Sequence, residues 1–239
     1  MSVRLLPNVP VHSLALFALC AATPLVAASP VAEEVRTLPD IGAPAGGKAA
    51  WIARAMRLNG VPMTIKSFTT ATNAAEVLHQ YERRLRRSAD MKTRRARHGS
   101  WHVLGVMTTE YYATIRTRDT PQGTEGVIIV TPPLADVKPM KRTRFPLPES
   151  TTVVSLQEYD DAGVEAEHIT LASPRSVALE ARAFTAQLSR HGWQLLRSEA
   201  TKAGDGHVIE AQRAAALAFI TLRRAEQGGS TILVVWRKA

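Results

Sequence analysis

The sequence predicts an α+β protein built from two tandem units, at residues 50–131 and 151–239. Each unit is expected to contain a β-hairpin, one helix and an antiparallel sheet of three to four further strands, with the helix packed on one sheet face. Two observations predict this fold class. Each block places one apolar helical stripe before several strands, and the two blocks match each other along their length.

The match between the blocks indicates an internal duplication. When the second block is moved back by 105 residues, Ile115 falls on Ile220 and Gly123 on Gly228. In the hairpin and the helix the offset is 103 residues, and such a difference is typical of a loop insertion. A chance match of short apolar patterns is the alternative. One ungapped register over the strands, with a shared Gln-Gly turn, favours duplication.

Each unit is expected to begin with a hairpin. In the first unit the pair Asn59-Gly60 is the strongest short hairpin signal, and it lies between two candidate strands within residues 56–70. In the second unit the turn residues Asp161-Ala162-Gly163 take the same place. Both hairpins therefore come before the predicted helices.

One helix follows each hairpin. The first is predicted to begin after Asn73, which forms a capping box with Glu76. The second is predicted to use Ser173 as its cap and Pro174 as its first helical residue. Apolar residues recur on one face of both helices, which predicts that this face is buried.

Strands separated by turn residues complete each unit. They are expected at residues 101–108, 111–118 and 126–132 in the first unit, and at 193–200, 207–213, 217–224 and 230–238 in the second. One helix covers only one face of such a sheet, so the other face is expected to be partly solvated or docked against a partner.

Three segments are expected to lie outside the two units. Residues 1–28 combine a short apolar run with a small-residue cleavage site after Ala28, which predicts a cleaved secretory signal peptide and a periplasmic or secreted protein. An uncleaved anchor is the alternative. Residues 29–49 are predicted to be a flexible leader, and the proline-rich residues 132–150 a semi-rigid linker.

The sequence contains no catalytic motif. The single cysteine, Cys20, lies in the predicted signal peptide, so a mature chain has no thiol for catalysis or for a metal site. The histidines lack metal-ligand spacing, and neither a nucleophile motif nor a phosphate-binding loop is found. We therefore expect no catalytic residue, no metal and no cofactor. An exported enzyme with a cleft between the two units is the alternative.

Positive charge is concentrated in one stretch of a chain whose formal net charge is +9. The eight basic residues are Arg83, Arg84, Arg86, Arg87, Lys92, Arg94, Arg95 and Arg97. The matching part of the second unit carries few charges, so the fold does not require them. Arginine predominates, and its guanidinium group favours bidentate binding of phosphate or carboxylate.

These observations predict a non-enzymatic envelope protein that acts as a binding or assembly module. Its basic face is expected to contact an envelope protein or an anionic surface of membrane headgroups or lipopolysaccharide. Nucleic acid is not expected as a partner in this compartment, and nothing in the sequence indicates an oligomeric state. A solvated basic surface without a ligand is the alternative.

Overall fold

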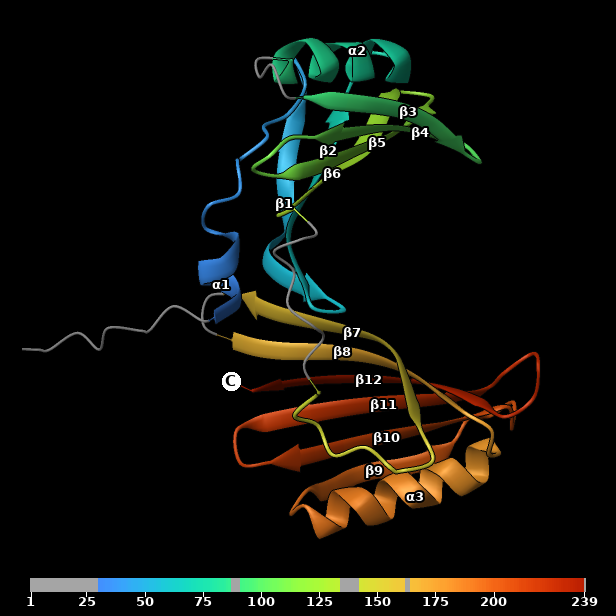
Figure 1. Cartoon of the computed structure of the whole chain (residues 1–239). Helices are drawn as coiled ribbons and strands as arrows, with labels where there is room; N and C mark the ends of the chain where they lie inside the picture. The colour runs from blue at the N-terminus through green and yellow to red at the C-terminus, as the bar shows by residue number, and fades with distance from the viewer. Residues whose placement is uncertain (1–29, 87–90, 134–141, 162–163, 239) are drawn as a thin grey trace, which may run out of the picture.

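The computed structural model describes residues 30–86, 91–133, 142–161 and 164–238 (Figure 1). The structure is 54% strand and 16% helix, and its described residues form one twelve-stranded antiparallel sheet and three helices, one of them short. The expected α+β class, with two units that each have a sheet and a covering helix, is therefore wrong. The fold is dominated by one sheet, because strands from the two predicted units pair with each other.

Apart from α1, the same order of elements occurs twice along the described chain. Residues 30–133, called the first half here, contain α1 (Pro30–Val35), β1 (Lys48–Leu58), β2 (Val61–Thr70), α2 (Ala74–Leu85), β3 (Lys92–His98), β4 (Trp101–Met107), β5 (Tyr112–Thr120) and β6 (Gly123–Thr131). Residues 142–238, the second half, contain β7 (Thr152–Asp161), β8 (Val164–Ser173), α3 (Val177–Arg190), β9 (Gln194–Ala200), β10 (Gly206–Arg213), β11 (Ala216–Arg224) and β12 (Ser230–Lys238).

The strand order of the sheet is symmetric about its centre. It runs β3-β4-β5-β6-β2-β1-β7-β8-β12-β11-β10-β9, so the second half repeats the first in reverse, with β1 and β7 in the middle. Such an order is what two copies of one unit would produce if they joined through their first strands. The internal duplication itself stays a prediction.

The offset between the halves changes in the last strand. Ile115 lies opposite Ile128 in the first half, and Ile220 lies opposite Val234 in the second. The core residues of β5 and β11 are thus 105 positions apart, but those of β6 and β12 are 106 apart (234 − 128). The ungapped offset expected from the sequence is wrong for this strand, because one added loop residue exchanges the two faces of the strand.

Of two local predictions, a hairpin turn and a helix cap, the structure confirms the first and contradicts the second. The Asn59-Gly60 turn is confirmed, with Leu58 opposite Val61 and both turn residues at positive φ. The prediction that Ser173 caps the second helix is wrong, because α3 begins at Val177 with Ser176 as its N-cap. Ser173 instead donates a hydrogen bond to the buried carboxylate of Glu180 at 2.7 Å, within the fold.

The first helix is capped as the sequence predicts. The side chain of Asn73 accepts a hydrogen bond from the Glu76 amide at 2.9 Å, and α2 starts at the next residue, Ala74. This bond satisfies one of the amide groups that a helix leaves unpaired at its start.

Each helix buries its apolar stripe in the core of its own half. Tyr81 of α2 belongs to a buried cluster with Leu104 and Ile115 of the first half. Phe184 of α3 belongs to another cluster with Ile209 of the second half. The two cores share no residue, so each half has an apolar interior of its own.

The segments before β1 and β7 also pack into these cores. The segment predicted as a flexible leader contains α1 and places Ile41 in the core of the first half. The segment predicted as a linker places Phe145 in the core of the second half. Each segment therefore covers part of the core of its own half.

The two halves are arranged with their helices on the outside. Figure 1 shows α2 above the strands of the first half and α3 below the strands of the second half, so the opposite faces of the sheet look toward each other. We call these the inner faces. Register shifts at Ala53 in β1 show where the regular pairing with β2 is interrupted, and such bulges bend and twist a sheet.

The signal peptide expected at residues 1–28 lies outside the described residues. Among the helices that the structure describes, none is both long and apolar enough to span a membrane.

Candidate anion-binding face

The structure divides the basic stretch between two faces of the sheet. Thr93 and Arg95 of β3 both donate hydrogen bonds to Glu82 of α2, which places them on the side of the helix. Side chains alternate along a strand, so Lys92 and Arg94 lie on the inner face. The eight residues therefore do not form one continuous basic patch, because successive cations of β3 lie on opposite faces of the sheet.

Two of the cations on the helix side pair with Glu82. Its carboxylate lies 2.6 Å from the guanidinium of Arg95 and 3.4 Å from that of Arg86. The hydrogen bond from Arg95 lowers the pKa of Glu82 below the ordinary value, although partial burial opposes this change. Glu82 therefore links α2 to the edge strand β3.

Acidification is expected to remove this link. Because the pKa of Glu82 is lowered in the folded chain, its stabilisation is present above the ordinary carboxyl pKa of 4.5 and is lost as the pH falls through the lowered value. Glu82→Gln should reduce the free energy of unfolding at pH 7 by less than about 1 kcal/mol. Urea unfolding at pH 7 and pH 3 measures the difference in the free energy of unfolding between Glu82→Gln and the parent chain. A difference that is larger at pH 3 than at pH 7 would contradict the prediction.

Arg84 serves the packing of the chain before β1. Its guanidinium donates to the carbonyl oxygens of Gly42 at 2.8 Å and Ala43 at 2.9 Å, and it lies 4.6 Å from the ring centre of Tyr81. Burial raises the pKa of Tyr81 to about 12, although Arg84 opposes the change. Arg84 is therefore a structural residue.

Two further cations of the helix side also have partners. Arg83 lies 3.4 Å from a carboxylate oxygen of Glu76, and Arg97 donates to the carbonyl oxygen of Gly99 at 3.2 Å. Arg87, which the sequence includes in the basic face, lies outside the described residues. Of the eight predicted residues, this leaves Lys92 and Arg94 on the inner face.

Cations from β5 lie on the same inner face. Arg116 and Arg118 alternate with Ile115 and Thr117, both buried on the helix side. Each guanidinium lies 4.9 Å from the ring centre of Trp101 in β4, so the indole has two cations beside it. Arg118 also pairs with Glu125 of β6.

The strand register brings these cations together across β4. Arg94 lies opposite Gly105, and Arg116 lies opposite Val103, two positions away on the same face. A Cβ atom built on Gly105 would meet only the backbone oxygen of Arg94, at 3.7 Å. The surface between the two guanidinium groups is therefore low and open.

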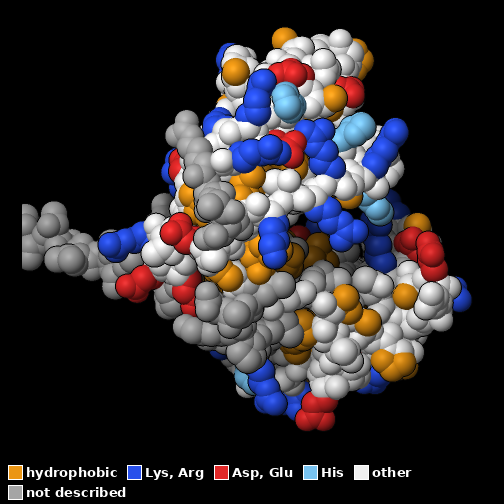
Figure 2. Space-filling view, turned by 45° about the horizontal axis from the view of Figure 1, so that its top comes forward, with side chains coloured by type: hydrophobic (Ala, Val, Ile, Leu, Met, Phe, Trp, Pro, Cys, Tyr) orange, Lys and Arg blue, Asp and Glu red, His pale blue; other side chains and the backbone are white. Residues whose placement is uncertain are grey.

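Three of the inner-face cations lack a carboxylate partner among the described residues, whereas Arg118 is paired with Glu125. Within the described ranges, no carboxylate lies within 4.0 Å of the charged groups of Lys92, Arg94 or Arg116. We call Lys92, Arg94, Trp101, Arg116 and Arg118 the basic inner face. Figure 2 shows Lys and Arg side chains concentrated on the first half and the surface hollowed between the halves.

Sequence reasoning missed three residues of this face: Trp101, Arg116 and Arg118. The available signal was the alternation of Arg116 and Arg118 with core residues in a strand that the sequence does predict. The position of positive charge along the chain does not show this face, because β3 and β5 come together only through the pairing of each with β4.

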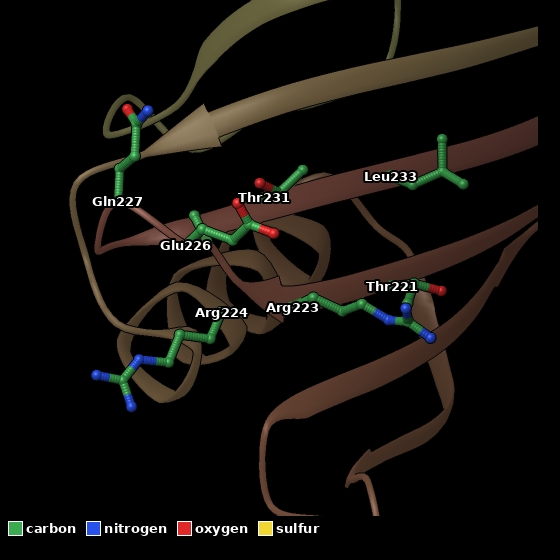
Figure 3. Close-up of a pocket in the computed structure, with 8 residues that line it drawn as sticks. Thr221, Arg223, Arg224, Glu226, Gln227, Thr231 and Leu233 are labelled. Carbon is green, nitrogen blue, oxygen red and sulfur yellow. The ribbon is translucent and has the colours of Figure 1, made fainter.

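The inner face of the second half is more apolar. Phe219 of β11 is 48% exposed and Leu233 of β12 is 44% exposed. A shallow hollow of about 790 Å³ continues from Leu233 to the turn between these strands. Figure 3 shows that Arg223 and Arg224 point in different directions there, so their charges do not converge on one point.

Groups for metal binding are not gathered in the part of the chain that is described. No cluster of three or more His, Cys, Asp or Glu side chains that could bind a metal ion is found among those residues. Comparison with known proteins finds no matching family, no similar curated protein and no similar solved structure.

Proposed function

We propose that this chain is an exported, non-enzymatic binding module of the cell envelope, and that its basic inner face binds an acidic segment of a partner protein. The observation that carries this proposal is the contrast between the two sides of β3. Arg95 has a carboxylate at 2.6 Å, whereas Lys92, Arg94 and Arg116 have none among the described residues. Cations that the fold leaves unpaired are available to an external anion.

The place of this face favours a protein segment over a bilayer. The basic inner face looks toward the second half (Figure 1). A narrow chain segment reaches such a surface more easily than a flat layer of headgroups. Exposed Phe219 and Leu233 lie on the facing side and suit a segment that carries apolar residues as well as carboxylates. Trp101 adds an aromatic contact of the kind that is enriched at protein interfaces.

The test compares two triple variants that lose the same charge. One replaces Lys92, Arg94 and Arg116 with glutamine, and the other replaces the ion-paired Arg83, Arg86 and Arg95. The probe is a fluorescent peptide of alternating Glu and Leu, measured by anisotropy with residues 29–239. We expect the first variant to lose about tenfold or more in affinity and the second less than about threefold. Binding should weaken at 0.5 M salt because exposed charges are screened.

The outcomes separate the alternatives. Equal losses in both triple variants would show that only net charge matters and would overturn the proposed face. Vesicles with anionic and with neutral headgroups form a second arm. If the chain binds anionic vesicles and ignores the peptide, and if only the first variant loses this binding, the face is a membrane contact and the protein-segment proposal is wrong.

A further inference from the structure

A cavity of about 310 Å³ lies at one end of the second half, on the side of α3. Phe145, Trp193 and Trp236 line one part of it, and the turn Ala214–Ala216 between β10 and β11 lines another. This volume falls at the lower end of the range of small-molecule sites, about 300–1,000 Å³. The cavity is separate from the basic inner face, which belongs to the first half and to the opposite side of the sheet.

The aromatic residues form an ordered apolar surface. The ring of Phe145 lies 5.3 Å from that of Trp193, edge to face, and 6.4 Å from that of Trp236, stacked. The indole N–H of Trp236 donates to the buried carboxylate of Glu167 at 2.9 Å, which fixes its orientation. Aromatic rings held in this way bind flat apolar groups well.

The indole N–H of Trp193, unlike that of Trp236, donates no hydrogen bond to a described residue. This nitrogen is buried and has no hydrogen-bond acceptor among the described residues. Buried indole N–H groups normally have a partner, so this one is unusual in a folded interior. It lies in a side chain that lines the cavity.

The first half shows why the cavity exists. Met107 lies opposite Tyr112 in β4 and β5, and Gln212 lies opposite Leu217 in β10 and β11, so the two turns have equal length. Tyr111 therefore corresponds to Ala216. The ring of Tyr111 packs against the core of the first half, whereas Ala216 presents only a methyl group to the cavity.

Two of the cations that line the cavity, Arg213 and Lys238, have no carboxylate partner among the described residues. Arg213 lies 5.2 Å from the ring centre of Trp193 and donates to the carbonyl oxygen of His191 at 3.3 Å. Neither Arg213 nor Lys238 has an ion pair with a described carboxylate, whereas Arg144 is paired with Glu165 at 2.9 Å. The rim of the cavity therefore carries uncompensated positive charge.

We propose that this cavity binds a small amphiphile with a flat apolar body and one anionic group. The apolar body packs against Phe145, Trp193 and Trp236, and the anionic group lies at the rim beside Arg213 and Lys238. This inference does not depend on the proposed function, because the two sites share no residue.

The test uses two probes of similar shape and different charge: 8-anilinonaphthalene-1-sulfonate and the neutral N-phenyl-1-naphthylamine. We expect one bound sulfonate probe per chain, with quenching of tryptophan fluorescence. The double variant Arg213→Gln/Lys238→Gln should weaken the sulfonate at least about fivefold, because two charged contacts are lost. The neutral probe should change less than about twofold. Arg223→Gln/Arg224→Gln loses the same charge elsewhere and should change neither.

A second variant tests the cavity itself. Ala216→Tyr restores the ring that the first half has in this place, and it should abolish binding of both probes while the far-UV circular dichroism stays unchanged. Phe219→Ser removes an exposed ring of the inner face and should have no effect. Loss of binding in Phe219→Ser but not in Ala216→Tyr would overturn the proposal. If Ala216→Tyr does not fold, equal responses of the two probes to the Arg213/Lys238 variant would overturn it.

Discussion

Replacing Arg57 with methionine is expected to lower the free energy of unfolding by about 3 kcal/mol. Arg57 is only 4% exposed, and it lies at the pairing of β1 with β7. Its guanidinium is 2.7 Å from Glu34 of α1 and 2.9 Å from Glu158 of β7. One cation thus connects three elements at the junction of the halves, and methionine keeps an unbranched apolar stem but has no charge.

The electrostatics of Arg57 explain the size of this effect. Burial acts to lower the pKa of the guanidinium, but the hydrogen bonds to Glu34 and Glu158 more than offset it, so the net pKa is raised and the group stays charged. Removing one member of such a group costs about 3–5 kcal/mol because the remaining charges stay buried. The carboxylates retain some solvent contact, which favours the lower end of that range.

Guanidinium unfolding of the full chain measures this loss. The triple variant Arg57→Met/Glu34→Gln/Glu158→Gln should recover much of the lost free energy of unfolding. All three of its side chains are neutral, so no buried carboxylate is left without a cation. Arg224→Met, at an exposed arginine without an ion pair to a described carboxylate, should stay within about 0.5 kcal/mol of the parent. A loss below about 1 kcal/mol for Arg57→Met would show that the junction does not depend on this cation.

The junction is also the feature that the sequence could not predict. Asn59-Gly60 and the Asn73 cap act over a few residues, and patterns of that range predict a hairpin and a helix end. The contact between Asn59 and Leu156 joins residues 97 positions apart, at 2.9 Å. No local pattern encodes such a pairing, so two units with separate sheets were expected where one sheet exists.

The candidate site also depends on contacts between residues that are distant in the sequence. A run of charge along the chain included Lys92 and Arg94, which have no carboxylate partner among the described residues, but it also included Arg84 and Arg95, whose partners come from other elements. It also omitted Arg116, which reaches the site through the register of β3, β4 and β5. Whether a surface cation is free depends on its neighbours in space.

Truncating Phe184 to alanine is expected to lower the free energy of unfolding of the second half by about 3–5 kcal/mol. The stability of the first half should stay unchanged. Phe184 is fully buried in a core that contains no residue of the first half. The two halves meet at three paired positions of β1 and β7, beginning at Met56 and Tyr159, and at the contacts of Arg57 and Asn59 beside them. So short a contact transmits little of the destabilisation, and each half should open as its own cooperative unit.

Native-state hydrogen exchange distinguishes local from shared loss. In Phe184→Ala, the amides of β8 and β10–β12 should lose protection, while those of β4–β6 should keep it. Tyr81→Ala is the matched change, because Tyr81 fills the corresponding place in the core of the first half, and it should give the reverse pattern. If either substitution lowered protection equally in both halves, the twelve strands would form one cooperative unit. The junction at Arg57 would then couple the basic inner face of the first half to the cavity of the second.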